Sequence, residues 1–143
     1  MAIIDYQFRT DSTPPAEKLD DLIEAVGWGR RGAQAWDRIC ALSSLLVTVW
    51  DGEDIVGMGR VLDDGTMCMV YDIAVHPDHQ GRGIGSRIMA GIVEHLKSQS
   101  YQSIGLFAWA ANPMNVPFYE KFGFTRVDFG MKFDLNGQAQ PRA

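Results

Sequence analysis

Three glycines within five positions mark the segment where chemistry is easiest to place. Gly81, Gly83 and Gly85 follow an apolar stretch that ends at Val75, and they lead directly into an amphipathic pattern. Glycine removes the side chain where a backbone must turn or approach a ligand closely. The unpaired N–H groups at a helix start, with the positive end of the helix dipole, suit a phosphate or pyrophosphate. The segment therefore predicts an anion site.

The spacing of these glycines excludes two common phosphate loops. No Lys-Ser or Lys-Thr follows them, as a P-loop requires, and Ser86 stands where a dinucleotide fingerprint would have its third glycine. Arg82 and Arg87 can add positive charge, although a solvated surface also explains Arg82. In the alternative interpretation the glycines only let helix and strand pack closely, but a polar loop with three glycines is a poor packing device.

The remaining pattern shows which elements must position this loop. A strand is expected at 3–9, then a helix opened by Thr13-Pro14 and ended by Gly27, and a second helix at 31–43. We expect the following residues of the second helix to face inward: Trp36, Ile39, Cys40 and Leu42.

Three strands at 45–50, 55–62 and 67–75, separated by Asp-Gly turns, predict an antiparallel meander. A helix from Gly83 and a strand at 103–108 then complete a βαβ crossover with parallel strands. A short helix from Asn115 to near Gly123 and a hairpin at 124–127 and 130–135 close the pattern. The fold class is a mixed, mostly antiparallel α/β sheet of six or seven strands with flanking helices.

The composition is that of an ordinary one-domain chain. The 143 residues are 46% hydrophobic and 22% charged, which excludes intrinsic disorder, and no apolar run approaches a membrane span. A net charge of −5 argues against nucleic-acid binding, which needs a basic surface. We expect a single domain over 1–143 with a flexible tail at 136–143, and a cytoplasmic location because the start lacks a signal-peptide pattern.

Neither the cysteines nor the histidines indicate a metal or a disulfide. Cys40 and Cys68 lie in apolar surroundings, where a free thiol behaves as a small hydrophobe. His76 and His79 flank Pro77, which argues against one helix presenting both, and no acidic or cysteine cluster completes a ligand set. We expect no metal and interpret both histidines as solvated loop residues.

Two segments resemble the GNAT superfamily of N-acetyltransferases. Gln80, Gly83 and Gly85 fill its acetyl-CoA loop pattern, Gln/Arg-x-x-Gly-x-Gly/Ala. The stretch from Asn112 to Phe124 looks like its later motif, Asn…Phe-Tyr-x-x-x-Gly-Phe. The likeness covers roughly 45–133, and two motifs in order are more specific than either alone. The first 44 residues carry no motif; in this family that part varies most and lies on the acceptor side.

The resemblance implies acetyl-CoA as co-substrate, entering where the two parallel strands splay apart. Tyr119 would lie near the cofactor sulfur. The cofactor-binding residues would be three strand residues that pair with the pantetheine arm, seven loop residues that hold the pyrophosphate, and one later amide: Ile73, Ala74 and Val75; Gln80, Gly81, Arg82, Gly83, Ile84, Gly85 and Ser86; and Asn112.

The implied chemistry is direct attack, in a ternary complex, by a primary amine of a small molecule on the acetyl group. A strand N–H, of Ala74 or Val75, would donate to the thioester carbonyl as negative charge develops on it. The phenol of Tyr119 would protonate the leaving thiolate. Two alternatives stay open: a protein or peptide N-acetyltransferase, and a non-catalytic acyl-CoA-binding module. The general base, the preferred acyl group and the oligomeric state, monomer or homodimer, are also open.

The chain departs from the family pattern at two points. Many members carry a glutamate as general base in the strand before the loop, whereas the only carboxylate in that strand here is Asp72. Asp72 is either a general base or a contact to the acceptor, or else a solvated or capping residue. Pro117 would break a helix that began at Asn112, so we start that helix near Asn115 and leave Asn112 in the loop.

Tryptophans are the candidates for an acceptor pocket. Trp28 lies in a Gly-Trp-Gly loop between the two N-terminal helices, and Trp109 follows the second parallel strand. Each could equally be a core residue, which is the commoner role of tryptophan.

Overall fold

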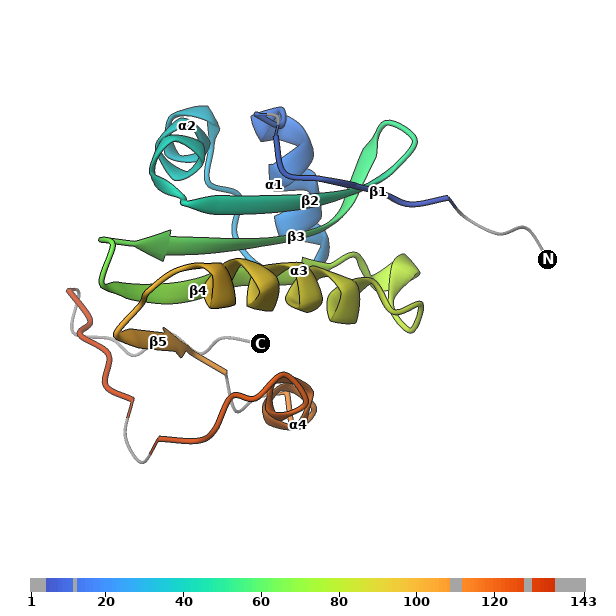
Figure 1. Cartoon of the computed structure of the whole chain (residues 1–143). Helices are drawn as coiled ribbons and strands as arrows, with labels where there is room; N and C mark the ends of the chain where they lie inside the picture. Colours follow the sequence, from blue (N-terminus) through green and yellow to red (C-terminus); the bar gives the residue numbers. More distant parts are fainter. Residues whose placement is uncertain (1–4, 12, 109–111, 128–129, 136–143) are drawn as a thin grey trace. The chain divides into compact units, whose positions relative to one another are not determined.

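The computed structural model describes residues 5–11, 13–108, 112–127 and 130–135. The chain divides into two compact units, Met1–Leu106 and Phe107–Ala143. The second unit contains one helix, α4 (Asn115–Glu120), among its described residues. The first contains these elements: β1 (Gln7–Arg9), α1 (Ala16–Ala25), α2 (Ala33–Leu42), β2 (Leu45–Asp51), β3 (Asp54–Asp63), β4 (Met67–Val75), a 3₁₀ turn (Pro77–His79), α3 (Ile84–Ser98) and β5 (Ser103–Leu106) (Figure 1).

The first unit is built on one mixed sheet in the order β1-β2-β3-β4-β5. The first four strands pair antiparallel, and β4 and β5 pair parallel through the α3 crossover, as the sequence predicts. The fold class is thereby confirmed. The strand count differs from the expected six or seven, because five strands form the sheet of the described residues.

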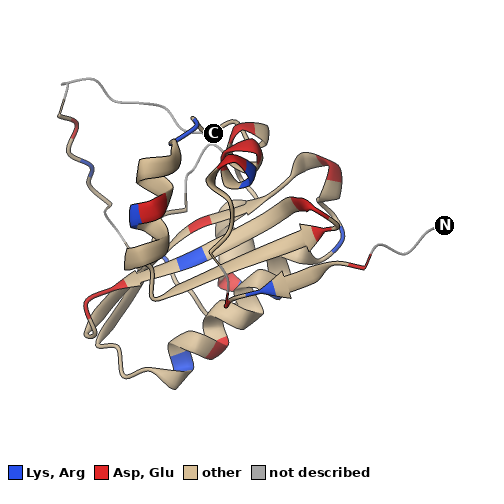
Figure 2. Cartoon of the chain, turned by 90° about the horizontal axis from the view of Figure 1, so that it is seen from above, with Lys and Arg blue, Asp and Glu red and all other residues tan. Residues whose placement is uncertain are grey.

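Helices cover both faces of this sheet (Figures 1 and 2). Successive strand residues face opposite sides. On β3, Met58 belongs to the core formed with α1 and α2, whereas its neighbours Gly57 and Gly59 point at Ile88 of α3. A Cβ added at Gly59 would lie 2.7 Å from a carbon of Ile88, so α3 sits directly on the sheet. The α3 residues facing the sheet are fully buried at Ile88, Met89 and Ile92.

Three local expectations are wrong. The first helix begins at Ala16 after Pro15, so Thr13 does not cap it. Leu42 is 67% exposed, because α2 ends there and the next residue is already extended. The closing hairpin is absent: the described residues of 124–127 and 130–135 form no strand, and Met131 and Phe133 are exposed. Their alternating pattern is typical of a strand, but strand propensity acts only with a pairing partner.

No helix among the described residues is long and apolar enough to span a membrane. Within the same residues, no group of three or more His, Cys, Asp or Glu side chains is arranged to hold a metal ion. Cys40 and Cys68 are free thiols, and burial raises the pKa of each.

Candidate functional site

The second half of β4 has a strand neighbour on one side only, within the part of the chain that the structure describes. β5 pairs with β4 from Met67 to Val70 and ends at Leu106, whereas β4 continues to Val75 against β3. The sheet therefore opens along residues 71–75, as the resemblance implies for the parallel strands. A half-paired strand offers its backbone groups to an extended ligand.

The β3–β4 register shows which groups face this free edge. His76 donates its backbone N–H to Val56, 2.8 Å away, and bonded positions alternate along an antiparallel pair. The backbone N–H and C=O groups of Ala74 therefore point toward β3, and those of Val75 point outward to the free edge. The Gln80 amide nitrogen, 3.1 Å from the Val75 carbonyl oxygen, marks the same outward side. Of the two strand donors considered from the sequence, Val75 is the one at the free edge.

The glycine loop connects this edge to α3. Gly81 and Gly83 have φ angles of 77° and 80°, in the left-handed region that favours glycine, and Gly83 is the N-cap of α3. A Cβ built at either would meet nothing within 4 Å. The interpretation of these two glycines as packing devices is therefore wrong, because none of the described residues packs against them.

The helix start itself is suited to an anion. No side chain caps α3, so its first N–H groups keep the unpaired state that helix geometry imposes. The following exposed or half-buried residues flank that start: Gln80, Arg82, Gly85, Ser86 and Arg87. The open space over the glycines, the uncapped helix and the free strand edge together fit a pantetheine arm ending in a pyrophosphate.

Tyr6, just before β1, and Phe8 on β1 contact the glycine loop and the first turn of α3. The Tyr6 hydroxyl lies 2.7 Å from Nδ1 of His79 and accepts from Arg82 at 3.3 Å. The Arg87 guanidinium lies 3.9 Å from the centre of the Phe8 ring. His79 is thus a bonded, mostly covered residue rather than the solvated one that the sequence predicted.

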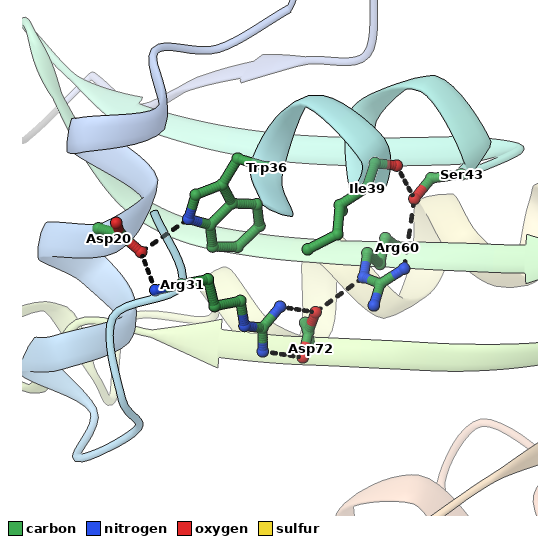
Figure 3. Close-up of polar contacts among 7 residues, drawn as sticks. All are labelled: Asp20, Arg31, Trp36, Ile39, Ser43, Arg60 and Asp72. Carbon is green, nitrogen blue, oxygen red and sulfur yellow. Dashed lines mark hydrogen bonds and ion pairs between the residues drawn. The ribbon is translucent and has the colours of Figure 1, made fainter. Parts of the chain in front are cut away.

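Asp72 has an environment that the sequence did not predict (Figure 3). Its carboxylate accepts two hydrogen bonds from Arg31, at 2.7 and 2.9 Å, and one from Arg60 at 2.7 Å. The Asp72 side chain is 10% exposed and that of Arg60 13%, so the solvated and capping interpretations are wrong. Burial raises the pKa of the Asp72 carboxyl, but the guanidinium bonds and charges outweigh it and leave the pKa below its ordinary value.

Asp20, on α1, binds the backbone of Arg31. The Asp20 carboxylate accepts hydrogen bonds from the backbone N–H of Arg31 and from the indole N–H of buried Trp36, the latter at 2.7 Å (Figure 3). It also accepts one from the backbone N–H of Gly32. Burial opposes ionisation of Asp20, yet these three donors leave its pKa lowered. The segment before α2 is therefore fixed to both α1 and β4.

The later motif lies in the second unit. α4 begins at Asn115, and Asn112 precedes it in a loop, where its side-chain oxygen accepts the backbone N–H of Met114 at 3.0 Å. The start predicted from Pro117 is confirmed. Tyr119 is half-buried on α4 beside Phe118 and Phe124, and burial raises the pKa of its phenol.

The two tryptophan candidates have different outcomes. Trp28 is half-buried and packs against the core cluster that includes Leu19, Leu22 and Trp36. Trp109 lies outside the described residues. Trp28 therefore has core contacts, while its proposed role toward an acceptor stays a prediction.

Sequence reasoning missed Arg31, Arg60 and Asp20 as members of a site. One signal could have found Arg60 and Asp72: each is a charged residue inside an otherwise apolar strand. A buried charge requires a partner, so two opposite charges on neighbouring strands predict an ion pair. Arg31 carries no such signal, because it lies in a polar loop.

Comparisons with known proteins show the family to which the chain belongs. An uncharacterized N-acetyltransferase, ycf52, of Porphyra purpurea is 30% identical over 120 residues, covering 80% of this chain and 67% of that protein. A mycothiol acetyltransferase of Corynebacterium glutamicum is 31% identical over 111 residues, covering 76% of this chain and 38% of its own. The chain thus spans two thirds or less of the length of these two relatives.

Solved structures and a family model complete the comparison. A probable acetyltransferase from meticillin-resistant Staphylococcus aureus superposes with a TM-score of 0.79 at 28% identity, covering 91% of this chain and 99% of that one. The model of the acetyltransferase (GNAT) family matches residues 8–124, which include the glycine loop and the later motif. The match confirms the resemblance read from those motifs: the chain belongs to the GNAT acetyltransferase family.

Proposed function

We propose that this protein is an acetyl-CoA-dependent N-acetyltransferase that acetylates a primary amine of a small molecule. The observation that carries the proposal is the free edge of β4, which ends at Val75 and continues through the glycine loop into the uncapped start of α3. The edge can pair with an extended amide-bearing arm, and the helix start can bind phosphates. Family membership supports the same acetyl transfer.

In this proposal the stretch 73–75 holds the arm through the backbone groups that Ile73 and Val75 turn outward, while those of Ala74 face β3. The outward N–H of Val75 donates to the carbonyl that becomes an oxyanion. A fixed backbone donor at such a point needs no reorganisation when charge develops, which lowers the barrier. When bound, acetyl-CoA supplies the acetyl group as a thioester. Residues 80–86 bind the pyrophosphate through backbone N–H groups, and Asn112 adds a hydrogen bond.

Tyr119 is proposed as the general acid. A phenol has an ordinary pKa of about 10 and is protonated near pH 7. Burial raises the pKa of Tyr119 further, so the phenol stays protonated near pH 7 and can donate a proton to the departing thiolate. Asp72 is a poor general base in comparison, because its lowered pKa and three guanidinium bonds leave it little affinity for a proton.

The test is release of free thiol from acetyl-CoA with a panel of arylalkylamines, polyamines, amino sugars and peptides. Acetyl-CoA without acceptor provides the hydrolysis background. Turnover with one small-amine class above that background supports the proposal, and turnover with peptides alone replaces it with the protein-acetylating alternative. Calorimetric binding of CoA without turnover on any acceptor would assign the non-catalytic module instead.

A further inference from the structure

The free edge of β4 begins at an irregularity in the sheet. Two β4 residues, Asp72 and Ile73, lie opposite the single β3 residue Gly59, so β4 contains one extra residue there. Asp72 has a φ of 55°, and it is the only described residue other than glycine with a positive φ. A left-handed conformation disfavours residues with a Cβ, although aspartate adopts it more readily than most, so contacts that hold Asp72 there stabilise the bulge.

The two residues of this bulge are anchored on opposite faces of the sheet. Ile73 fills the space over Gly59, where an added Cβ would lie 2.7 Å from its Cδ1, and packs there with Ile88 of α3. Asp72 reaches the other face, toward α2, and is bonded by Arg31 and Arg60 (Figure 3). Rotating the Asp72 backbone to an ordinary φ would pull its carboxylate away from both guanidiniums.

The two arginines are themselves held in place. Arg60 lies on β3, 5.0 Å from the centre of the Tyr71 ring, and one of its nitrogens lies 3.4 Å from the Ser43 hydroxyl. The backbone N–H of Arg31 binds Asp20, and its guanidinium lies 4.9 Å from the centre of the Trp36 ring. Both cations therefore reach Asp72 from supported positions.

We propose that Arg31 and Arg60 are positioning residues for acetyl transfer: by binding the Asp72 carboxylate they hold the bulge in its left-handed conformation, and so direct the backbone groups of Val75 to the free edge. This inference rests on the proposed function, since it assigns that edge to the cofactor. Asp72 acts here through its backbone, which distinguishes this role from a general base or an acceptor contact.

Two triple variants with equal charge test the inference. Both carry Arg31→Met and Arg60→Met; one adds Asp72→Gly and the other Asp72→Ala. Glycine adopts a positive φ freely and alanine does not, so only the glycine variant keeps the bulge without the ion pairs. We expect its CoA dissociation constant, measured by calorimetry, to stay within about threefold of wild type. The alanine variant should bind CoA at least tenfold more weakly, with native circular dichroism in both.

A single-site pair covers the case in which a triple variant does not fold. Asp72→Asn and Asp72→Ala both remove the negative charge that Arg31 and Arg60 bind, but asparagine keeps one amide oxygen as an acceptor and tolerates the left-handed conformation better than alanine. The asparagine variant should bind CoA several-fold more tightly than the alanine variant. Equal CoA affinity within each pair, whether wild-type-like or weak, overturns the positioning role. Failure of the wild-type protein to bind CoA would refute the proposed function itself, before any variants are compared.

Discussion

The glycine loop and the charged cluster around Asp72 border the same stretch of β4, yet they are built by opposite means. The loop uses consecutive residues, and its properties are those of the backbone: positive φ at Gly81 and Gly83, and an uncapped helix start. The cluster uses side chains from separate elements, with Arg31 and Arg60 lying 41 and 12 positions before Asp72. Local chemistry is visible in a motif, whereas long-range chemistry is visible only after folding.

Mutations in the two regions should also have different effects, on ligand binding in the loop and on stability in the cluster. The loop residues support little packing, because a Cβ at Gly81 or Gly83 would meet no described atom within 4 Å. Changes there should therefore reduce ligand binding and cost stability only through the backbone strain of a side chain at positive φ, about 1–2 kcal/mol. The cluster lies beside the core, and Asp20 alone satisfies three donors, so changes there should reduce stability first. The following experiments test that division.

The largest effect is expected at Tyr119. Like the glycine loop, this residue is identified from a sequence motif. General acid catalysis typically contributes about 10²–10⁴-fold, so Tyr119→Phe should lower kcat by that range while folding and CoA affinity stay unchanged. Because the phenol must be protonated and burial raises its pKa, wild-type activity should fall only as the pH rises above about 10. The phenylalanine variant should lack that decline. If the chemical step is rate-limiting and the variant turns over within threefold of wild type, Tyr119 lines the site without donating a proton.

The next effect is on stability, at Asp20. Asp20→Ala leaves the indole N–H of Trp36 and two backbone N–H groups without their acceptor, and an unsatisfied buried donor costs about 1–3 kcal/mol. We expect a loss of about 3 kcal/mol in the free energy of unfolding by urea. Asp21→Ala is the matched control, because Asp21 is 65% exposed in a surface ion pair worth about 0–1 kcal/mol. Equal losses in the two variants would contradict the assigned role of Asp20.

Most of the first unit could be predicted from the sequence, because its elements are set by local periodicity. The meander, α3 and the parallel crossover follow from apolar spacing and Asp-Gly turns, and their observed bounds differ from the expected ones by at most a few residues. The closing hairpin is a wrong prediction, because its alternating residues have the pattern of a strand but are in no strand among the described residues. The sequence shows Asp72 as a carboxylate inside a strand, but the arginines that pair with it lie 41 and 12 positions away, so its environment depends on the fold.

A smaller effect, confined to binding, is expected in the glycine loop. Gly83→Glu places a negative side chain at the N-cap of α3, where the proposed pyrophosphate site lies, and should weaken CoA binding at least tenfold by calorimetry. Gly91→Glu adds the same charge to an exposed position of the same helix with nothing within 4 Å, and should leave the CoA affinity within about twofold. If Gly83→Glu binds CoA as wild type does while folded, the loop is not part of the cofactor site.

The smallest effect is a change in the acid dependence of stability caused by Asp72. Its folded-state pKa is lowered, so below the ordinary value of about 3.9 the unfolded chain binds this proton more readily than the folded one. The stabilisation is therefore complete above that pH and is lost as the pH falls through the folded-state pKa. Asp72→Asn removes the titration and should be less stable than wild type at pH 7, with the two free energies of unfolding converging as the solution is acidified. Free energies that stay parallel down to the acid transition would show that Arg31 and Arg60 do not lower the pKa of this carboxyl, and that the cluster holds Asp72 by shape rather than by charge.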